Sequence, residues 1–309
     1  MIEAECILLE KYTEYTGGGL PPPTSWDCEL TSDADVVSSG NRRFIQIDGL
    51  PDEIKAKAKS GSTTLLPGSS AKINNKSGRL HIPPGAQVST GYRKKAKNKG
   101  KRQSTPGGGR PDGVGGGPPN DRRLAPAIGE RPTIVVYVSN NGGAETPTYS
   151  KAILSNRVFG TDGDPVNLRS QYAACSADAV DFAPLTGNSN VATGPEAGVV
   201  TVNTTVPLTA SDDSSDMASA VASALEDMFV TSFPFEHAII CTPPGTFPSN
   251  AVAWAYLDHW LSIYNDKWCE EVSALMHEVS CSLGICNCFG FICMGFARFI
   301  HVSPSLHNF

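Results

Sequence analysis

The sequence predicts a mixed α+β or α/β protein, in which a small β-rich segment and a basic linker precede a larger domain. Three observations support this prediction. Short runs of β-branched and apolar residues, bordered by Gly and Pro, fill residues 1–90. Residues 91–123 are rich in Lys, Arg, Gly and Pro and cannot bury a core. From residue 124 onward, strand-like runs alternate with helical patterns, as in α/β folds.

The N-terminal segment, residues 1–90, carries three predicted strands, at Cys6–Leu9, Arg43–Ile47 and Arg79–Ile82. Cys6 and Cys28 are either a crosslink or two thiols that remain reduced. A crosslink would contribute most to a domain of this size, because a small core stabilises little by itself.

The linker, residues 91–123, is predicted to be disordered. Between Arg93 and Arg123 there are ten Lys or Arg and two Asp or Glu residues. The segment therefore carries +8, and the rest of the chain −14, of a net charge of −6. Lys99–Arg102 and Arg122–Arg123 resemble sites for an activating protease that cuts after basic pairs. A basic run can also serve nuclear import, and a solvated tether is the strongest alternative explanation. Because no aromatic residue interleaves the basic run to stack on bases, we do not expect nucleic-acid binding.

The larger domain, residues 124–309, has a strand or helix pattern in each of its main segments. Predicted strands are Thr133–Val138, Gly198–Val202, Glu236–Cys241 and Val252–Leu257. Asp216–Phe229 is a predicted helix, since Met217, Val221, Leu225 and Met228 repeat at helical spacing. Another helix is predicted to begin near Pro165 and to run to Cys175.

The last predicted helix runs from about Lys267 to Leu283, after a turn at Ile263–Asp266. Its apolar stripe consists of Val272, Leu275, Met276, Val279 and Leu283. His277 and Cys281 lie four residues apart, on a neighbouring face of the same helix.

This helix carries part of the zinc-peptidase motif H-E-x-x-H-x-x-G-x-x-H. In the full motif two histidines on one helix face bind zinc, and the glutamate between them is the general base. His277, Glu278 and Gly284 match, whereas Cys281 and Asn287 occupy the second and third ligand positions.

Several blocks, in the same order, resemble the gametolysin-type metallopeptidases of algae and diatoms, peptidase family M11. They are Val158–Leu168, Ser170–Ser176, Trp260–Cys269 and Met276–Glu278, with Glu5–Glu10 and Trp26–Leu30 resembling the pro-segment of that family. The resemblance implies a secreted zinc endopeptidase with a metzincin-like mixed sheet and an active-site helix. It also implies that residues 1–90 are a pro-segment, that His277 is a zinc ligand and that Glu278 is the general base.

The departures from the motif predict impaired activity. A thiolate at Cys281 binds zinc well, but its sulfur reaches less far from the backbone than an imidazole nitrogen. Asn287 is a poor ligand, and Cys286 and Cys288 beside it are possible replacements. A set of His277, Cys281, Cys286 and Cys288 would make a closed, structural site.

The chain after Gly284 loses the family pattern, so we expect the domain to be incomplete from about residue 284. Leu283–Ile300 is apolar apart from Asn287 and Arg298. Three explanations account for this apolar run: a misread gene boundary, a marginal membrane segment and a buried helix. We favour the misread gene boundary.

Nine cysteines favour an oxidising compartment, and the glycosylation sequons at Asn75 and Asn203 fit secretion. The resemblance implies an extracellular or cell-wall location. Met1–Cys6 is not expected to be a signal peptide, because it is acidic and the apolar run that follows it is too short. Either the chain stays inside the cell or its true start lies upstream, and we favour the second alternative.

Two main functional hypotheses follow. The first is a zinc endopeptidase-like protein acting on matrix or cell-wall proteins, with low or absent activity. The second is an inactive secreted binding or structural protein on the same scaffold. A nuclear protein using the basic run is a weaker third.

Other conspicuous residues have simple structural explanations. His237 is predicted to be an interior histidine and His259 a surface one. Cys175 and Cys269 form a disulfide or remain buried thiols, and Cys241 is an orphan thiol. Asp212, Asp213 and Asp216 cap a helix rather than bind a cation.

Overall fold

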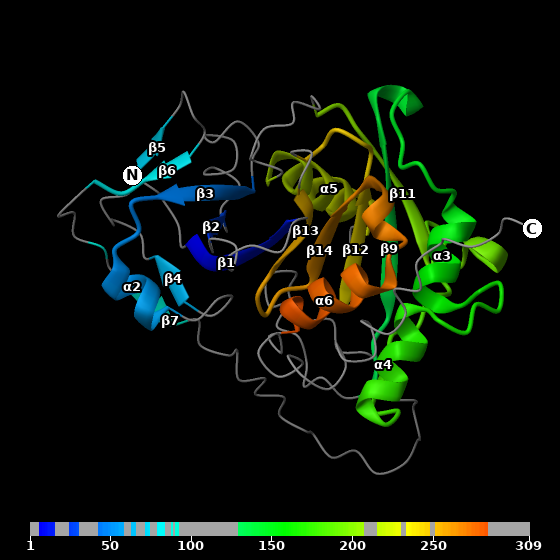
Figure 1. Cartoon of the computed structure of the whole chain (residues 1–309). Coiled ribbons are helices and arrows are strands. Elements are labelled where there is room, and N and C mark those ends of the chain that lie inside the picture. The colour runs from blue at the N-terminus through cyan, green and yellow to red at the C-terminus, as the bar shows by residue number, and fades with distance from the viewer. Residues whose placement is uncertain are drawn as a thin grey trace, which may run out of the picture.

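The computed structural model describes residues 6–15, 25–30, 43–58, 63–65, 72–74, 79–83, 88, 90–92, 129–206, 215–229, 233–247 and 251–283. The protein is a mixed α/β structure with one large mixed sheet, and helices lie on both faces of its C-terminal half (Figure 1).

The C-terminal half of the sheet has the strand order β11-β9-β12-β14-β13. The first four strands are mutually parallel, whereas β13 runs antiparallel to β14. Their bounds are β9 Thr133–Asn140, β11 Val199–Thr204, β12 His237–Thr242, β13 Ala251–Tyr256 and β14 Leu261–Asn265. Strands β9 and β12 are almost wholly buried, since helices cover both faces.

The N-terminal strands extend the same sheet beyond β13, in the order β1-β2-β3-β6-β5. Strand β1 runs antiparallel to β13 on one side and to β2 on the other. The bounds are β1 Cys6–Tyr15, β2 Ser25–Leu30, β3 Phe44–Asp48, β4 Thr63–Leu65, β5 Lys72–Asn74, β6 Arg79–His81 and β7 Thr90–Tyr92. Two further strands, β8 Gly129–Glu130 and β10 Val180–Asp181, form a small parallel pair.

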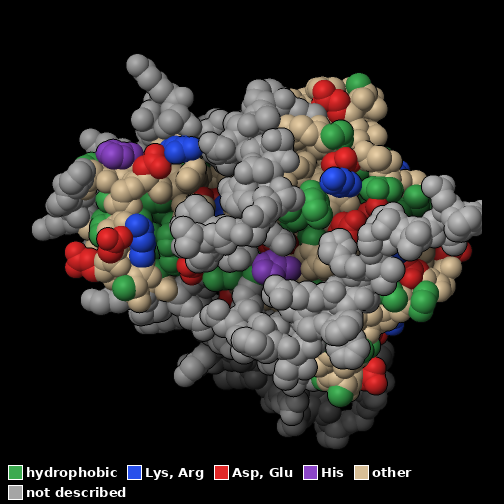
Figure 2. Space-filling view, viewed as in Figure 1, with side chains coloured by type: hydrophobic (Ala, Val, Ile, Leu, Met, Phe, Trp, Pro, Cys, Tyr) green, Lys and Arg blue, Asp and Glu red, His purple; other side chains and the backbone are tan. Residues whose placement is uncertain are grey.

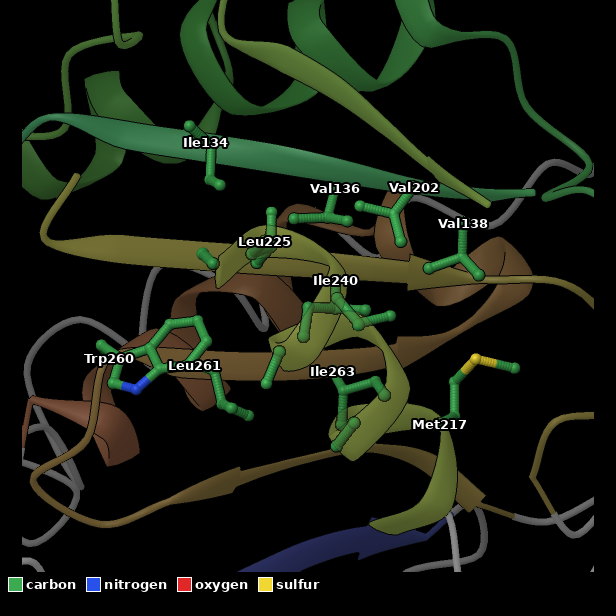
Figure 3. Close-up of a cluster of buried hydrophobic side chains, with 14 of the residues drawn as sticks. Ile134, Val136, Val138, Val202, Met217, Leu225, Ile240, Trp260, Leu261 and Ile263 are labelled. Carbon is green, nitrogen blue, oxygen red and sulfur yellow. The ribbon is translucent and has the colours of Figure 1, made fainter. Parts of the chain in front are cut away.

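The two faces of the C-terminal sheet bury separate apolar clusters. Helix α5 (Ser215–Met228) covers one face, where Met217 and Leu225 pack on Val136, Ile240 and Ile263 (Figure 3). Helices α3 (Lys151–Phe159), α4 (Leu168–Ser176) and α6 (Val272–Ser282) cover the other face. The side chains of β9 alternate between the two clusters, as the two-residue period of a strand requires.

A third apolar cluster lies among the N-terminal strands and includes Leu8, Ile45 and Leu80. The short helix α2 (Asp52–Lys57) packs beside it through Ile54. Three 3-10 turns complete the described elements: η1 Asn141–Gly143, η2 Gly194–Glu196 and η3 Asp266–Cys269.

Each predicted strand contributes to an observed strand, and the predicted helix at Asp216–Phe229 corresponds to α5. The turn predicted at Ile263–Asp266 is wrong, because β14 continues to Asn265 beside β12. The last helix begins at Val272 rather than Lys267, since η3 intervenes. Residues 93–128, 207–214 and 284–309 lie outside the described residues, and with them most of the predicted linker, Asp212, Asp213 and the C-terminal run.

The disulfides confirm one predicted pairing and correct another. Cys6 is bonded to Cys28, which joins β1 to β2. Cys241 is bonded to Cys269, so the predictions of an orphan thiol at Cys241 and of a Cys175–Cys269 bond are wrong. The parallel pairing of β12 and β14 brings Cys241, at the end of β12, close to η3, which follows β14.

Candidate metal centre on helix α6

Helix α6 is held on the sheet by its apolar stripe. Leu275 and Val279 are fully buried in the cluster that α6 shares with α3 and α4, and Leu283 continues the row. Because residues four apart lie on one side of a helix, this stripe places His277 and Cys281 together on an adjacent side.

The ring nitrogen Nε2 of His277 lies 3.8 Å from Sγ of Cys281. A tetrahedral zinc ion lies roughly 2.0–2.1 Å from an imidazole nitrogen and about 2.3 Å from a thiolate sulfur, which separates the two donors by about 3.6 Å. The spacing of these two atoms therefore fits one shared zinc ion. The structure brings together the two residues that the sequence predicts as ligands.

The sulfur of Cys281 is disulfide-bonded in this structure, and that of Cys175 is also in a disulfide. Cys281 is fully buried, whereas His277 is half-buried. A metal ligand must be a thiolate, so zinc can use Cys281 only in the reduced protein.

Glu278, the predicted general base, is fully buried on the next position of the helix. A general base must lie within hydrogen-bond reach of the water that it deprotonates. Water therefore reaches this carboxylate only after a local rearrangement around α6.

No cluster of three or more His, Cys, Asp or Glu suited to a metal ion occurs in the described part of the chain. Gly284, Cys286, Asn287 and Cys288, which complete the predicted motif, lie outside that part. The described site thus provides one imidazole donor, and a second donor, the sulfur of Cys281, only after reduction of its disulfide.

Tyr172 supports α6 from helix α4, a role that the sequence did not indicate. Its hydroxyl is 2.7 Å from Oγ of Ser280 and donates a 3.2 Å hydrogen bond to the carbonyl oxygen of Met276. Burial raises the pKa of Tyr172 well above its ordinary value, so the phenol stays protonated. The only signal in the sequence is that Tyr172 lies in Ser170–Ser176, one of the blocks on which the expected resemblance rests.

His237 lies beneath the C-terminal end of α6 and is an interior histidine, as predicted. Its Nε2 lies 3.1 Å from Oγ of Ser262, and its Nδ1 lies 3.5 Å from Oγ of Ser282. Burial, and to a smaller extent the positive charge of Arg131, lower the pKa of His237 to about 3. The ring is therefore neutral at physiological pH.

The prediction that His259 lies at the surface is wrong. This residue follows β13 and is only 4% exposed. Its ring packs edge-on against Phe44 and Tyr256, and Nε2 lies 3.7 Å from Oε2 of Glu29. The sequence did not reveal this position because β2 and β3, which cover His259, come from the distant N-terminal segment.

An open hollow of about 440 Å³ lies at the start of α4, and its lining includes no residue of α6. Arg169 and Asp181 line it and pair with each other through two hydrogen bonds of 2.5 and 2.8 Å.

Acidic and basic side chains interleave over the described part of the face in Figure 2, with small hydrophobic groups between them. Within the described residues, no helix has the length and apolar character needed to cross a membrane.

No protein-family model, curated protein or solved structure matches the chain.

Proposed function

We propose that the protein is a zinc endopeptidase-like protein of an extracellular or cell-wall setting, with low or absent hydrolytic activity. The single observation that carries the proposal is the 3.8 Å spacing of His277 Nε2 and Cys281 Sγ, one helical turn apart and next to Glu278. The large mixed sheet and the helix that follows its last strand agree with what the sequence resemblance implies. Disulfides are frequent in proteins of oxidising compartments.

The roles of the residues follow from their chemistry. His277 would hold the ion, together with Cys281 once the disulfide of Cys281 is reduced. While that disulfide is intact, as an oxidising compartment favours, the described site offers zinc the imidazole alone, which agrees with low or absent activity. Zinc bound at such a site would act as a Lewis acid on a peptide carbonyl. Glu278 would accept a proton from the attacking water and pass it to the leaving amine. Tyr172 positions α6 through its bonds to Ser280 and Met276. We propose proteins of the matrix or cell wall as substrates and a protease that cuts the basic linker as the activator.

Zinc binding to the purified protein, with and without mild reduction, tests the metal site. We expect one equivalent of zinc in the reduced protein. His277→Ala should weaken zinc binding by at least about 100-fold. Even the substitution of a residue that only hydrogen-bonds to a metal ligand lowers metal affinity by about 10–100-fold. His81→Ala is the control, because His81 is an exposed residue of β6. Equal zinc binding by both variants would contradict the site.

A protease assay on the same samples tests the chemistry. We expect slow cleavage of a denatured protein, lost in Glu278→Gln and retained in Glu271→Gln, an exposed residue at the start of α6. Cleavage that survives Glu278→Gln would rule out Glu278 as the general base.

A second candidate function is an inactive secreted binding or structural protein on the same scaffold. The complete burial of Glu278 favours it, because a buried carboxylate cannot activate water without rearrangement. One equivalent of zinc without cleavage would support a closed structural site, and absence of zinc would support a scaffold that uses no metal.

A further inference from the structure

Strand β1 has two halves with different neighbours. Its first half pairs with β2 along one side and with β4 at Cys6 and Ile7 on the other. The Cys6–Cys28 disulfide also ties this half to β2. Its second half, residues 11–15, pairs with β13, whereas the pairing with β2 ends at Lys11. The first half is therefore fixed among the N-terminal strands, and β13 is the main strand partner of the second.

The pairing of residues 11–15 covers one side of β13. The other side of β13 pairs with β14. Without β1, β13 would be the edge strand of the C-terminal sheet. Extended peptides bind such edges by adding a strand. Helix α6, which carries His277, packs against β13.

One side chain fixes the position of the second half. Lys11 is 6% exposed, and its Nζ lies 4.4 Å from the ring centre of Trp254 on β13. Nζ also donates a 3.5 Å hydrogen bond to Oγ of Ser215. A buried ammonium over an indole face is a favourable cation–π contact, so a basic side chain at this position is stabilised by Trp254.

The far end of β1 pairs irregularly. The register shifts between Glu14 and Tyr15, where Tyr15 pairs with Ala251 rather than Val252. An irregularity of this kind interrupts the ladder of hydrogen bonds. The strand can therefore separate from this end as far as Lys11 and lose only the last pair with β2, Lys11 with Ser25.

We propose that residues 11–15 are an exchangeable strand that covers the edge of β13, and that their displacement opens this edge to an extended polypeptide with a basic residue at the position of Lys11. The polypeptide would bind antiparallel to β13 and place its Lys or Arg over Trp254. Only the identification of that polypeptide as a substrate rests on the proposed function.

The backbone pattern identifies the most informative substitution. The N–H of Leu257 donates a 3.0 Å hydrogen bond to the carbonyl oxygen of Glu10. Because hydrogen-bonded pairs alternate along an antiparallel ladder, the N–H of Tyr12 points toward β13 and that of Thr13 points away. Tyr12→Pro removes a bond to β13, and Thr13→Pro is the matched control.

The probe is a fluorescent peptide with the sequence of residues 6–15, carrying Cys6→Ser, added to the full chain. A tethered strand competes at an effective concentration on the order of millimolar, so Tyr12→Pro should bind the peptide at least about ten-fold more tightly than the wild type. Thr13→Pro should bind it as the wild type does. A Lys11→Ala peptide should bind the Tyr12→Pro protein several-fold more weakly.

Hydrogen exchange separates a displaced strand from a general loss of structure. In Tyr12→Pro, amides of β13 should exchange faster while those of β9 keep their protection. Peptide binding that is equal in all three proteins would overturn the proposal. Loss of protection in β9 would also overturn it, because residues 11–15 would then be indispensable to the fold.

Failure of the proposed function gives a different result. If the peptide binds the Tyr12→Pro protein tightly but the protein neither binds zinc nor cleaves a substrate, the proposal of an exchangeable strand is supported and the peptidase proposal fails. If zinc binds but the peptide does not, the strand proposal alone fails.

Discussion

At the scale of single residues, the neutral side chain of His237 depends on its surroundings. The ring lies between Ser262 and Ser282 and is fully buried. Burial lowers its pKa most, and the positive charge of Arg131 lowers it further. The pKa of His237 falls from an ordinary value of 6.5 to about 3. The unfolded chain therefore binds a proton between these pH values that the folded protein does not bind.

The stability of the protein should consequently fall on acidification. As the pH drops from 6.5 toward about 3, His237 should reduce the free energy of unfolding by roughly 1.4 kcal/mol for each pH unit. Denaturant unfolding at several pH values measures this slope. His237→Gln should be less stable at pH 7 but lose less on acidification, whereas His81→Gln, at an exposed site, should follow the wild type. Parallel slopes for wild type and His237→Gln would disprove the assignment.

At the scale of elements, the start of α4 is fixed by a reciprocal pair of hydrogen bonds. The side chain of Asn167 accepts a 2.9 Å bond from the N–H of Ser170, and Oγ of Ser170 accepts a 3.1 Å bond from the N–H of Asn167. Gly160 lies so near that a Cβ atom there would be 2.6 Å from Nδ2 of Asn167. Its φ of 74° also favours glycine.

Asn167→Ala should destabilise the protein by about 0.5–2 kcal/mol, because it leaves an N–H of the first helical turn without its acceptor. Denaturant unfolding gives the difference in free energy. Asn203→Ala, on the exposed face of β11, is the control and should change stability by less than about 0.5 kcal/mol. Equal effects of the two substitutions would show that the cap contributes nothing.

At the scale of the whole molecule, the N-terminal strands and the C-terminal sheet share one apolar cluster. Ile7, Leu9 and Phe44 lie in the cluster that α5 covers. Phe44 is fully buried, its ring centre is 5.3 Å from that of Tyr256, and its N–H donates a 3.0 Å bond to Oγ of Ser219. The guanidinium of Arg43 joins Glu29 on β2 to Glu226 on α5. The two parts should therefore unfold together.

Phe44→Ala should cost about 3–5 kcal/mol and should speed amide exchange in α5 as well as in β3. Ile54→Ala, in helix α2 beside the N-terminal cluster, should leave exchange in α5 less affected. Hydrogen exchange resolved by segment makes the comparison. Unchanged exchange in α5 after Phe44→Ala would indicate that the two parts fold independently.

The sequence by itself determined the elements with a sustained local pattern: the strands β9, β11, β12 and β13, the helix α5, and the shared face of His277 and Cys281. These follow from the two-residue period of strands and the 3.6-residue period of helices, which neighbouring residues encode. The β14 strand was missed because a short apolar run next to polar residues reads equally well as a turn. Parallel pairing with β12 made it a strand.

Only the tertiary structure decided what depends on residues far apart in the chain. It joined β1 to β13, buried His259 under β3, bonded Cys241 to Cys269 and enclosed Glu278. Each of these results depends on which surfaces meet when the chain closes on itself. Local periodicity carries no information on that choice, because the same alternating strand can pair with any compatible edge.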